Sequence, residues 1–169
     1  RVPGLHNIYN ALAASAIGLC LEETMEHIVE GLGDYQGIHG RLTIVTLPNG
    51  ATLVDDTYNS NPSSLNAALD SVKELMKNGG RIIVGLGEMM ELGAETVPAH
   101  SEAGRMVAEL DAFYFAAMGE HAQEMIQGAV DHGFPEEKTA RVTTHMEMVQ
   151  ILGDVVKDGD LVLLKGSRK

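Results

Sequence analysis

The sequence predicts an α/β fold: a mostly parallel, Rossmann-like sheet flanked by helices and preceded by a short helical segment. From residue 81 onward, β-rich apolar runs alternate with amphipathic helical patterns, which is typical of βαβ units. Hydrophobic residues make up 44% of the 169 residues, so the chain can bury a sizeable core. With 3 Phe, 4 Tyr and no Trp, that core is expected to be aliphatic.

Two helical patterns come first. Apolar side chains recur at helical spacing in residues 6–20, and a second helix is expected over 22–31. Segment 33–41 carries three glycines and no apolar periodicity, so it contains the predicted domain boundary. We therefore expect a helical piece over residues 1–38 and a separate domain over 39–169.

A β-hairpin is predicted at the start of the second domain. Residues 41–47 and 51–56 are β-rich, and the Pro-Asn-Gly sequence at 48–50 favours a turn between them. The Asn-Pro pair at 61–62 is suited to the N-cap and first position of a helix expected over 63–77.

The remaining elements alternate. Thr144 and Glu147 form a T-x-x-E capping-box pattern at the last helix. Strands joined through helices run parallel, so most of the sheet is expected to be parallel. The expected strands are 81–87, 112–119, 140–144 and 160–166, and the expected helices are 97–110, 120–131 and 145–157.

Charge and composition exclude several classes of protein. The formal net charge of -12 repels a phosphate backbone, and no basic stripe is visible, so nucleic-acid binding is not expected. No apolar run approaches the ~20 residues that span a bilayer, and no signal-peptide pattern is visible. The single cysteine, Cys20, is expected to be a buried, inert thiol. We expect a cytoplasmic protein without membrane insertion.

Two common ligand motifs do not occur in the chain. There is no G-x-x-x-x-G-K-[ST] phosphate-binding loop. The seven histidines lack metal-ligand spacing and no Cys/His cluster is present, so no metal site is predicted.

Polar segments follow four of the predicted strands at their carboxyl ends. They are residues 55–61, 85–93, 119–121 and 165–168. In an open parallel sheet ligands bind beyond this edge, and unrelated loops would be scattered over both ends. The clustering predicts a site there.

Several residues of these segments have more than one interpretation. Asp55 and Asp56 can hold a metal, accept hydrogen bonds from a ribose, or cap the following helix. Lys165, Ser167 and Arg168 can present cations and a hydroxyl to a carboxylate or phosphate, or simply form a polar strand end.

Two asparagines in the first helical pattern need a separate explanation. Asn7 and Asn10 lie three residues apart in an Ala-rich run, although Asn is a weak helix former. Asn7 can cap the helix, and the Asn10 amide can read the hydrogen-bonding edge of a ligand.

Five motifs together resemble those of the Mur ligases. GLHNIYNALAA, the GR at 40–41, DDTYNSNPSSLNAAL, GEMMELG and LLKGSR occur here in the order seen in that family. The D-D-x-Y-N-x-N-P and M-x-E-L-G forms are most similar to the members that add D-alanyl-D-alanine to UDP-N-acetylmuramoyl-tripeptide. The resemblance covers essentially the whole chain.

The resemblance implies a three-domain ligase of which this chain is a C-terminal fragment. Residues 1–38 would end the central ATP-binding domain, and 39–169 would be the C-terminal Rossmann-like domain. Such ligases use ATP and Mg²⁺, bound mainly by the upstream domain with its phosphate-binding loop, to convert the tripeptide carboxylate into an acyl phosphate that the D-alanyl-D-alanine amine attacks. The resemblance further implies a monomer, and a fragment inactive by itself.

The resemblance also assigns roles to individual residues. Glu88 replaces the family's usual Asp, which leaves an acidic role available with a longer side chain. The implied nucleotide-binding residues are Asn7 and Asn10 near adenine, Arg41 at the hinge, Asp55 and Asp56 at the ribose, and Tyr58, Asn59 and Asn61 along the cleft. The implied residues facing the incoming dipeptide are Glu88, Glu91, Lys165, Ser167 and Arg168.

Two alternatives remain from the sequence. The chain can belong to another Mur ligase or a folylpolyglutamate synthase-like ligase, although the DDTYNSNP form argues against both. It can also be a non-catalytic Rossmann-like binding module. A phosphate-binding loop encoded upstream of Arg1 would distinguish the ligase from the binding module.

Overall fold

The chain divides into two compact units, Arg1–Ile38 and His39–Lys169, each described by itself. The computed structural model describes residues 4–76 and 79–167. The predicted site residue Arg168 therefore lies outside the described residues.

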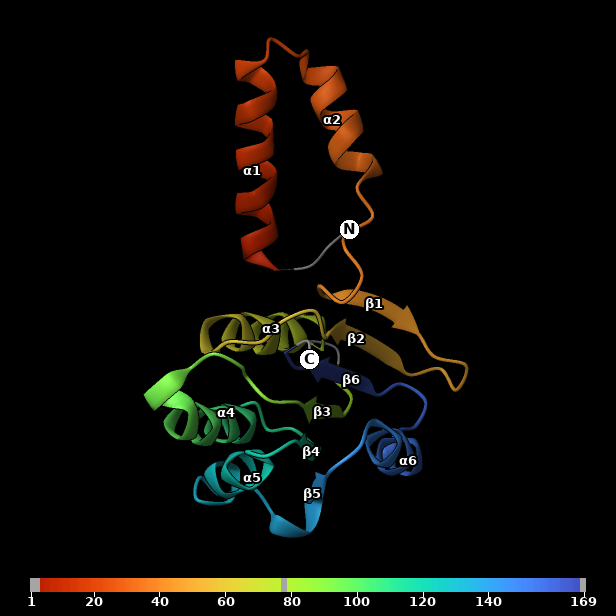
Figure 1. The fold of residues 1–169 in the computed structure, drawn as a ribbon. Helices are drawn as coiled ribbons and strands as arrows, with labels where there is room; N and C mark the ends of the chain where they lie inside the picture. Colours follow the sequence, from red (N-terminus) through yellow and green to blue (C-terminus); the bar gives the residue numbers. More distant parts are fainter. Residues whose placement is uncertain (1–3, 77–78, 168–169) are drawn as a thin grey trace. The chain divides into compact units, whose positions relative to one another are not determined.

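The first unit is a hairpin of two helices, α1 (Leu5–Cys20) and α2 (Met25–Asp34), which lie side by side (Figure 1). The N-cap of α2 is Thr24, whose hydroxyl accepts the His27 N–H at 3.2 Å, so the helix begins three residues later than predicted. The N-cap of α1 is Gly4. Asn7 therefore lies inside the helix, and its predicted capping role is wrong.

Most apolar side chains of the first unit are exposed. Two helices can cover only the seam between them, and none of the described residues of α2 is buried. Cys20 is exposed as well, so the prediction of a buried thiol is wrong for this chain. The exposed large apolar residues of α1 and α2 are Leu5, Ile8, Tyr9, Leu12, Ile17, Leu19, Met25, Val29 and Leu32.

The second unit is built on a six-stranded sheet of order β1-β2-β6-β3-β4-β5. Among the described strands only β1 is antiparallel to its neighbour, so the predicted mostly parallel sheet is confirmed. The last of the described strands, β6, lies in the middle of the sheet, between β2 and β3. The strands are β1 (Thr43–Thr46), β2 (Thr52–Asp56), β3 (Ile82–Leu86), β4 (Tyr114–Met118), β5 (Thr139–Val142) and β6 (Leu161–Lys165).

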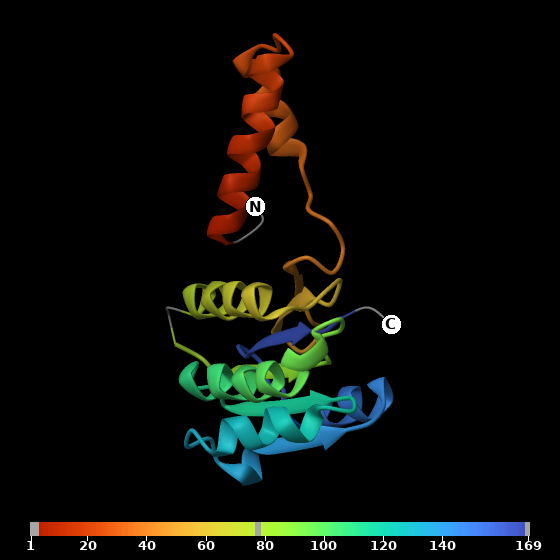
Figure 2. The same cartoon turned by 60° about the vertical axis from the view of Figure 1, so that its left-hand side comes forward.

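Helices cover both faces of this sheet, as Figures 1 and 2 show. One face carries α3, α4 and α5 over the larger apolar core, and the opposite face carries α6 over a smaller one. Both cores are mainly aliphatic, although Phe115 is fully buried. The helices are α3 (Pro62–Leu75), α4 (Thr96–Glu109), α5 (Ala122–Val130) and α6 (His145–Val155), with short 3₁₀ turns at η1 (Gly93–Glu95) and η2 (Glu136–Lys138).

The predicted helix starts are confirmed at α3 and partly at α6. Asn61 and Ser64 form a reciprocal capping box, and Pro62 is the first residue of α3. At α6 the Thr144 hydroxyl accepts the Glu147 N–H as predicted, but the Glu147 carboxylate accepts from Thr143 rather than from the cap residue. None of the described helices is both long and apolar enough to cross a membrane.

Helices α4 and α5 pack closely through two glycines. A Cβ on Gly104 would lie 2.6 Å from Ala129 N, and one on Gly128 would lie 2.7 Å from the carbonyl carbon of Ser101. Real Cβ atoms essentially never approach other atoms this closely. The absence of two side chains therefore sets the spacing between α4 and α5.

An ion pair joins the amino ends of β3 and β6, at the sheet edge opposite the predicted site. Arg81 donates to both oxygens of Asp160, at 2.8 and 2.5 Å, and to the Val155 carbonyl at 3.1 Å. Burial raises the pKa of Asp160, but the hydrogen bonds from Arg81 and from Lys157 N outweigh it, so the pKa lies below its ordinary value. The ion pair therefore stabilises the edge of the sheet that lies opposite the predicted ligand site.

Candidate functional site

The carboxyl ends of β2, β6 and β3 lie side by side, and their loops are bonded together. Ser167, after β6, donates its hydroxyl to the Ser60 carbonyl at 3.1 Å and accepts the Met90 N–H at 3.1 Å. Its own N–H donates to the Glu88 carbonyl at 2.9 Å. The structure thus brings together three of the polar segments that the sequence singled out.

Lys165 and Asp56 form a buried ion pair at the centre of this edge. Lys165 is 2% exposed, and its ammonium donates to Asp56 Oδ2 at 2.6 Å and to the Asn59 carbonyl at 2.8 Å. The other Asp56 oxygen accepts the Leu42 N–H at 3.1 Å. Asp56 therefore joins the end of β6 to the segment before β1. The predicted substrate contact of Lys165 stays a prediction, whereas its contacts within the chain hold the loop after β2.

The Asp55 carboxylate stabilises its own loop. Its Oδ1 accepts from Thr57 N at 3.1 Å and from the Thr57 hydroxyl at 2.6 Å, which is the pattern of an Asx turn. His39 Nδ1 lies 3.8 Å from the other oxygen. The helix is capped by Asn61, so of the three interpretations of the aspartate pair, helix capping does not apply to Asp55.

Arg41 and Tyr58 form a stacked pair at the two ends of the β1–β2 hairpin. The Arg41 guanidinium carbon lies 4.2 Å from the centroid of the Tyr58 ring, a cation–π contact. Tyr58 N donates to the Gly40 carbonyl at 2.9 Å, and Gly40 has a φ of 74°. A Cβ at Gly40 would lie 3.1 Å from Tyr58 N, so glycine permits this close approach. Both side chains remain exposed and available to a ligand.

The two asparagines of the loop after β2 make local hydrogen bonds. Asn59 Oδ1 accepts from Ser60 N at 2.9 Å, and Asn61 Oδ1 accepts from Ser64 N at 2.8 Å. These contacts fix the loop, and they do not test the predicted contact of either residue with a nucleotide.

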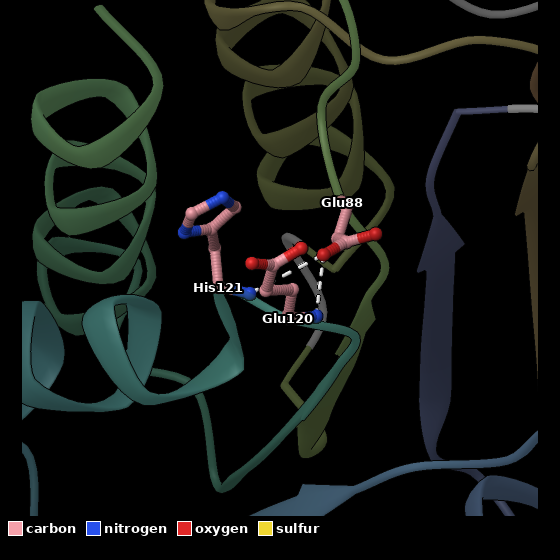
Figure 3. Close-up of side chains that lie close together, drawn as sticks. All are labelled: Glu88, Glu120 and His121. Carbon is pink, nitrogen blue, oxygen red and sulfur yellow. Dashed lines mark hydrogen bonds between the residues drawn. The ribbon is translucent and has the colours of Figure 1, made fainter.

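The loop after β3 carries two acidic side chains, of which Glu88 is bonded to the backbone of another loop and Glu91 is exposed. One oxygen of Glu88 accepts from the backbone N–H groups of Glu120 and His121, the second at 3.3 Å (Figure 3). Glu91 is exposed and has a φ of 64°. A non-glycine residue in this region is uncommon and is often found at functional sites.

Glu88, Glu120 and His121 form a cluster whose ligand atoms lie within 4.8 Å of one another (Figure 3). Spacing along the chain gave no sign of it, because Glu88 precedes the other two by more than 30 residues. The donor set fits Mg²⁺ poorly, since this ion prefers oxygen ligands and usually one or two carboxylates. The Glu88 oxygen also bonds the positive amino end of α5, which disfavours a cation.

The sequence prediction missed His100, a fully buried residue of α4 that bonds the backbone of the loop after β3. The buried face of α4 contains His100 together with Ala103 and Val107. Its spacing of three and seven residues from those positions was the available signal.

In the first unit, the two predicted asparagines lie together. Asn10 Nδ2 donates to Asn7 Oδ1 at 3.4 Å. Both line an open cavity of about 770 Å³ between α1 and α2, together with His27, Gly31 and Tyr35. An amide pair that lines such a cavity can form hydrogen bonds with the edge of a planar ligand.

Comparison with known proteins identifies the family. A family profile described as "Mur ligase, glutamate ligase domain" matches residues 40–168. The chain belongs to the Mur ligase family.

Three Mur ligases illustrate the similarity. The UDP-N-acetylmuramoyl-tripeptide–D-alanyl-D-alanine ligase of Escherichia coli strain K12 is 34% identical over 99% of the chain, and that of Bacillus subtilis strain 168 is 29% identical over 98%. The crystal structure of MurF from Acinetobacter baumannii superposes with a TM-score of 0.83 at 31% identity over 97% of the chain. The chain spans 35%, 36% and 35% of the lengths of these three relatives.

Proposed function

We propose that this chain is the C-terminal part of an ATP-dependent ligase that adds D-alanyl-D-alanine to UDP-N-acetylmuramoyl-tripeptide through an acyl phosphate, in peptidoglycan precursor synthesis. The observation that carries the proposal is the bonded group of loops at the carboxyl ends of β2, β6 and β3. Support comes from the relatives, which bear this activity in their names and match nearly the whole chain. The ligase would be cytoplasmic and monomeric.

The loop after β2 is the proposed nucleotide side of the site. Arg41 would place its guanidinium against the phosphates of ATP, oriented by the Tyr58 ring at 4.2 Å. Asp55 and Asp56 would face the ribose, and Asn59 and Asn61 would hold the loop in shape. Asn7 and Asn10 would contact adenine from the first unit.

The loops after β3 and β6 are the proposed acceptor side. The carboxylates of Glu88 and Glu91 would attract the ammonium group of the incoming dipeptide, and Ser167 and Arg168 would bind its polar groups. The ammonium of Lys165 bonds Asp56 and the Asn59 carbonyl, and these contacts support a role for Lys165 other than substrate binding. We therefore propose that Lys165 positions the loop after β2.

The first unit is proposed to be the end of a central ATP-binding domain. Its exposed apolar residues on α1 and α2 support this, since such a surface is normally covered by further protein. The Mg²⁺ ion and the phosphate-binding loop would belong to that domain.

The first experiment assays the complete gene product. ADP and phosphate should form only when both UDP-N-acetylmuramoyl-tripeptide and D-alanyl-D-alanine are present. Turnover with glutamate or another single amino acid instead of the dipeptide would assign the chain to another ligase of the superfamily. No turnover, with no phosphate-binding loop encoded upstream of Arg1, would favour the non-catalytic binding module.

The second experiment tests the nucleotide side. Arg41→Ala in the complete gene product should raise KM for ATP about ten-fold or more, the effect of losing one charge-assisted contact. Arg105→Ala is the matched control, because Arg105 pairs with Glu102 and Glu109 on the surface of α4. Equal ATP kinetics in the two variants would remove Arg41 from the site.

The third experiment uses the 169-residue chain alone. It should show no ligase activity, and titration calorimetry should show no micromolar binding of ATP with Mg²⁺. Micromolar binding would contradict the division of the nucleotide site between this chain and an upstream domain.

A further inference from the structure

His100 is a buried polar residue with both ring nitrogens bonded. Its side chain is 0% exposed, Nδ1 lies 2.6 Å from the Thr96 carbonyl oxygen, and Nε2 lies 3.0 Å from Met89 N. A carbonyl oxygen can only accept, so Nδ1 carries the proton. Nε2 accepts the Met89 N–H, which requires the neutral ring. The neighbours of His100 thus set one tautomer and one orientation.

The Met89 bond fixes the middle of the loop after β3. The Met89 side chain is itself buried, at 3% exposed, and the next amide, Met90 N–H, donates to Ser167 Oγ. The carbonyl of Glu88 accepts from Ser167 N. Three consecutive residues are therefore held by α4 and by the end of β6. The backbone that carries Glu88 and Glu91 cannot shift without breaking these bonds.

His100 also contacts the loop after β4. Its ring lies against that of His121, with centroids 4.8 Å apart and planes tilted by 36°. The backbone N–H groups of Glu120 and His121 in turn bind the Glu88 carboxylate (Figure 3). One buried ring thus reaches both loops that orient Glu88.

Packing alone does not explain a histidine at this position. An apolar side chain of similar volume would fill the space between α4 and the loop. It would leave the Met89 N–H without its acceptor, and an unpaired buried amide is costly. The histidine supplies Nε2 as an acceptor 3.0 Å from Met89 N, and this hydrogen bond determines where the loop after β3 lies.

We propose that His100 is a positioning residue for the acceptor substrate. Through the Met89 N–H it holds the backbone that carries Glu88 and Glu91 in the orientation needed to bind the ammonium of the incoming amine. The proposal rests on the proposed function for its kinetic part. Its structural part stands independently of that function.

Two conservative variants separate the two ring contacts. In His100→Gln the amide oxygen occupies the place of Nε2 and can accept the Met89 N–H. In His100→Asn the shorter amide keeps a donor near the Thr96 carbonyl but does not reach Met89. Hydrogen exchange of the Met89 amide in this chain should be near wild-type in the Gln variant and about ten-fold faster or more in the Asn variant.

The kinetic test uses the complete gene product. His100→Asn should raise KM for D-alanyl-D-alanine about 3- to 10-fold, the effect of one lost hydrogen bond, and leave KM for ATP unchanged. His100→Gln should restore the dipeptide KM. Wild-type dipeptide KM in the Asn variant, or equal changes in both variants, would overturn the proposal. An inactive wild-type enzyme would instead refute the proposed function.

A measurement without any variant completes the test. ¹⁵N NMR of the wild-type chain should show His100 as the neutral tautomer with the proton on Nδ1. A proton on Nε2 would exclude the bond to Met89 and overturn the proposal, even if both variants failed to fold.

Discussion

The buried pair of Lys165 and Asp56 gives the sharpest test of how the site is built. The side chains are 1% and 14% exposed, and Nζ lies 2.6 Å from Oδ2. At this distance the gross attraction is about 6 kcal/mol for an effective dielectric constant near 20, partly offset by desolvation. Lys165→Met leaves Asp56 charged and without its cation, so we expect a loss of about 3 kcal/mol in the free energy of unfolding.

A double-mutant cycle isolates the interaction. Asp56→Asn keeps an oxygen for the Leu42 N–H and removes the charge. The double variant buries neither charge, so its loss should be well below the sum of the single losses, with a coupling of about 2–3 kcal/mol. Urea unfolding of this chain measures all four proteins, and the slope m should stay constant.

The outcome decides between two roles for Lys165. Losses that add within about 0.5 kcal/mol would show that the lysine does not depend on Asp56, and would return it to the residues available for substrate. The matched control is Arg105→Met with Glu102→Gln, a pair on the surface of α4. Its losses should be additive, because exposed pairs contribute little.

Two further predictions concern stability. Gly104→Ala should destabilise the chain by about 1–3 kcal/mol, because its methyl group overlaps α5, whereas Gly153→Ala, with nothing within 4 Å, should stabilise it by about 0.5–1 kcal/mol. Equal melting temperatures would refute the close packing. Asp160→Asn should cost about 3 kcal/mol at pH 7, since Arg81 loses its partner. The folded-state pKa of Asp160 lies below the ordinary 3.8, so its stabilisation is present above that pH and is lost as the pH falls through the lower value. Urea unfolding from pH 7 to 2 should therefore show a constant difference between wild type and variant down to about pH 4 and a narrowing difference below it. Curves that stay parallel to pH 2 would contradict this.

Local patterns predicted the elements and the edge of the sheet that carries the site. Helix starts such as Asn61-Pro62 depend on residues close in sequence, so they could be read directly. Strand alternation with helices was enough for a mostly parallel sheet. The common direction of parallel strands then placed the polar loops on one edge.

Long-range side-chain partners could not be predicted in this way. Lys165 and Asp56 are 109 residues apart, and nothing near either residue indicates that they pair. The contact of Glu88 with the start of α5 also joins residues that are far apart in sequence, and no local pattern indicates it. His100 was missed because a polar residue within a helix is usually assigned to its solvent face. Cys20 was misassigned because apolar neighbours in sequence do not guarantee a covering layer in space.

The central place of β6 has a consequence for the order in which the protein is made. Strand β6 lies between β2 and β3 and pairs with both of them. Residues 165–167 also supply hydrogen bonds to the loop after β2 and the loop after β3. A nascent chain that stops before residue 161 has two unpaired strand edges, which are prone to aggregate, and no assembled site. Synthesis of β6, its pairing with β2 and β3 and formation of the site thus become one event. A truncated product should therefore be lost to misfolding rather than persist as a folded enzyme with a defective site.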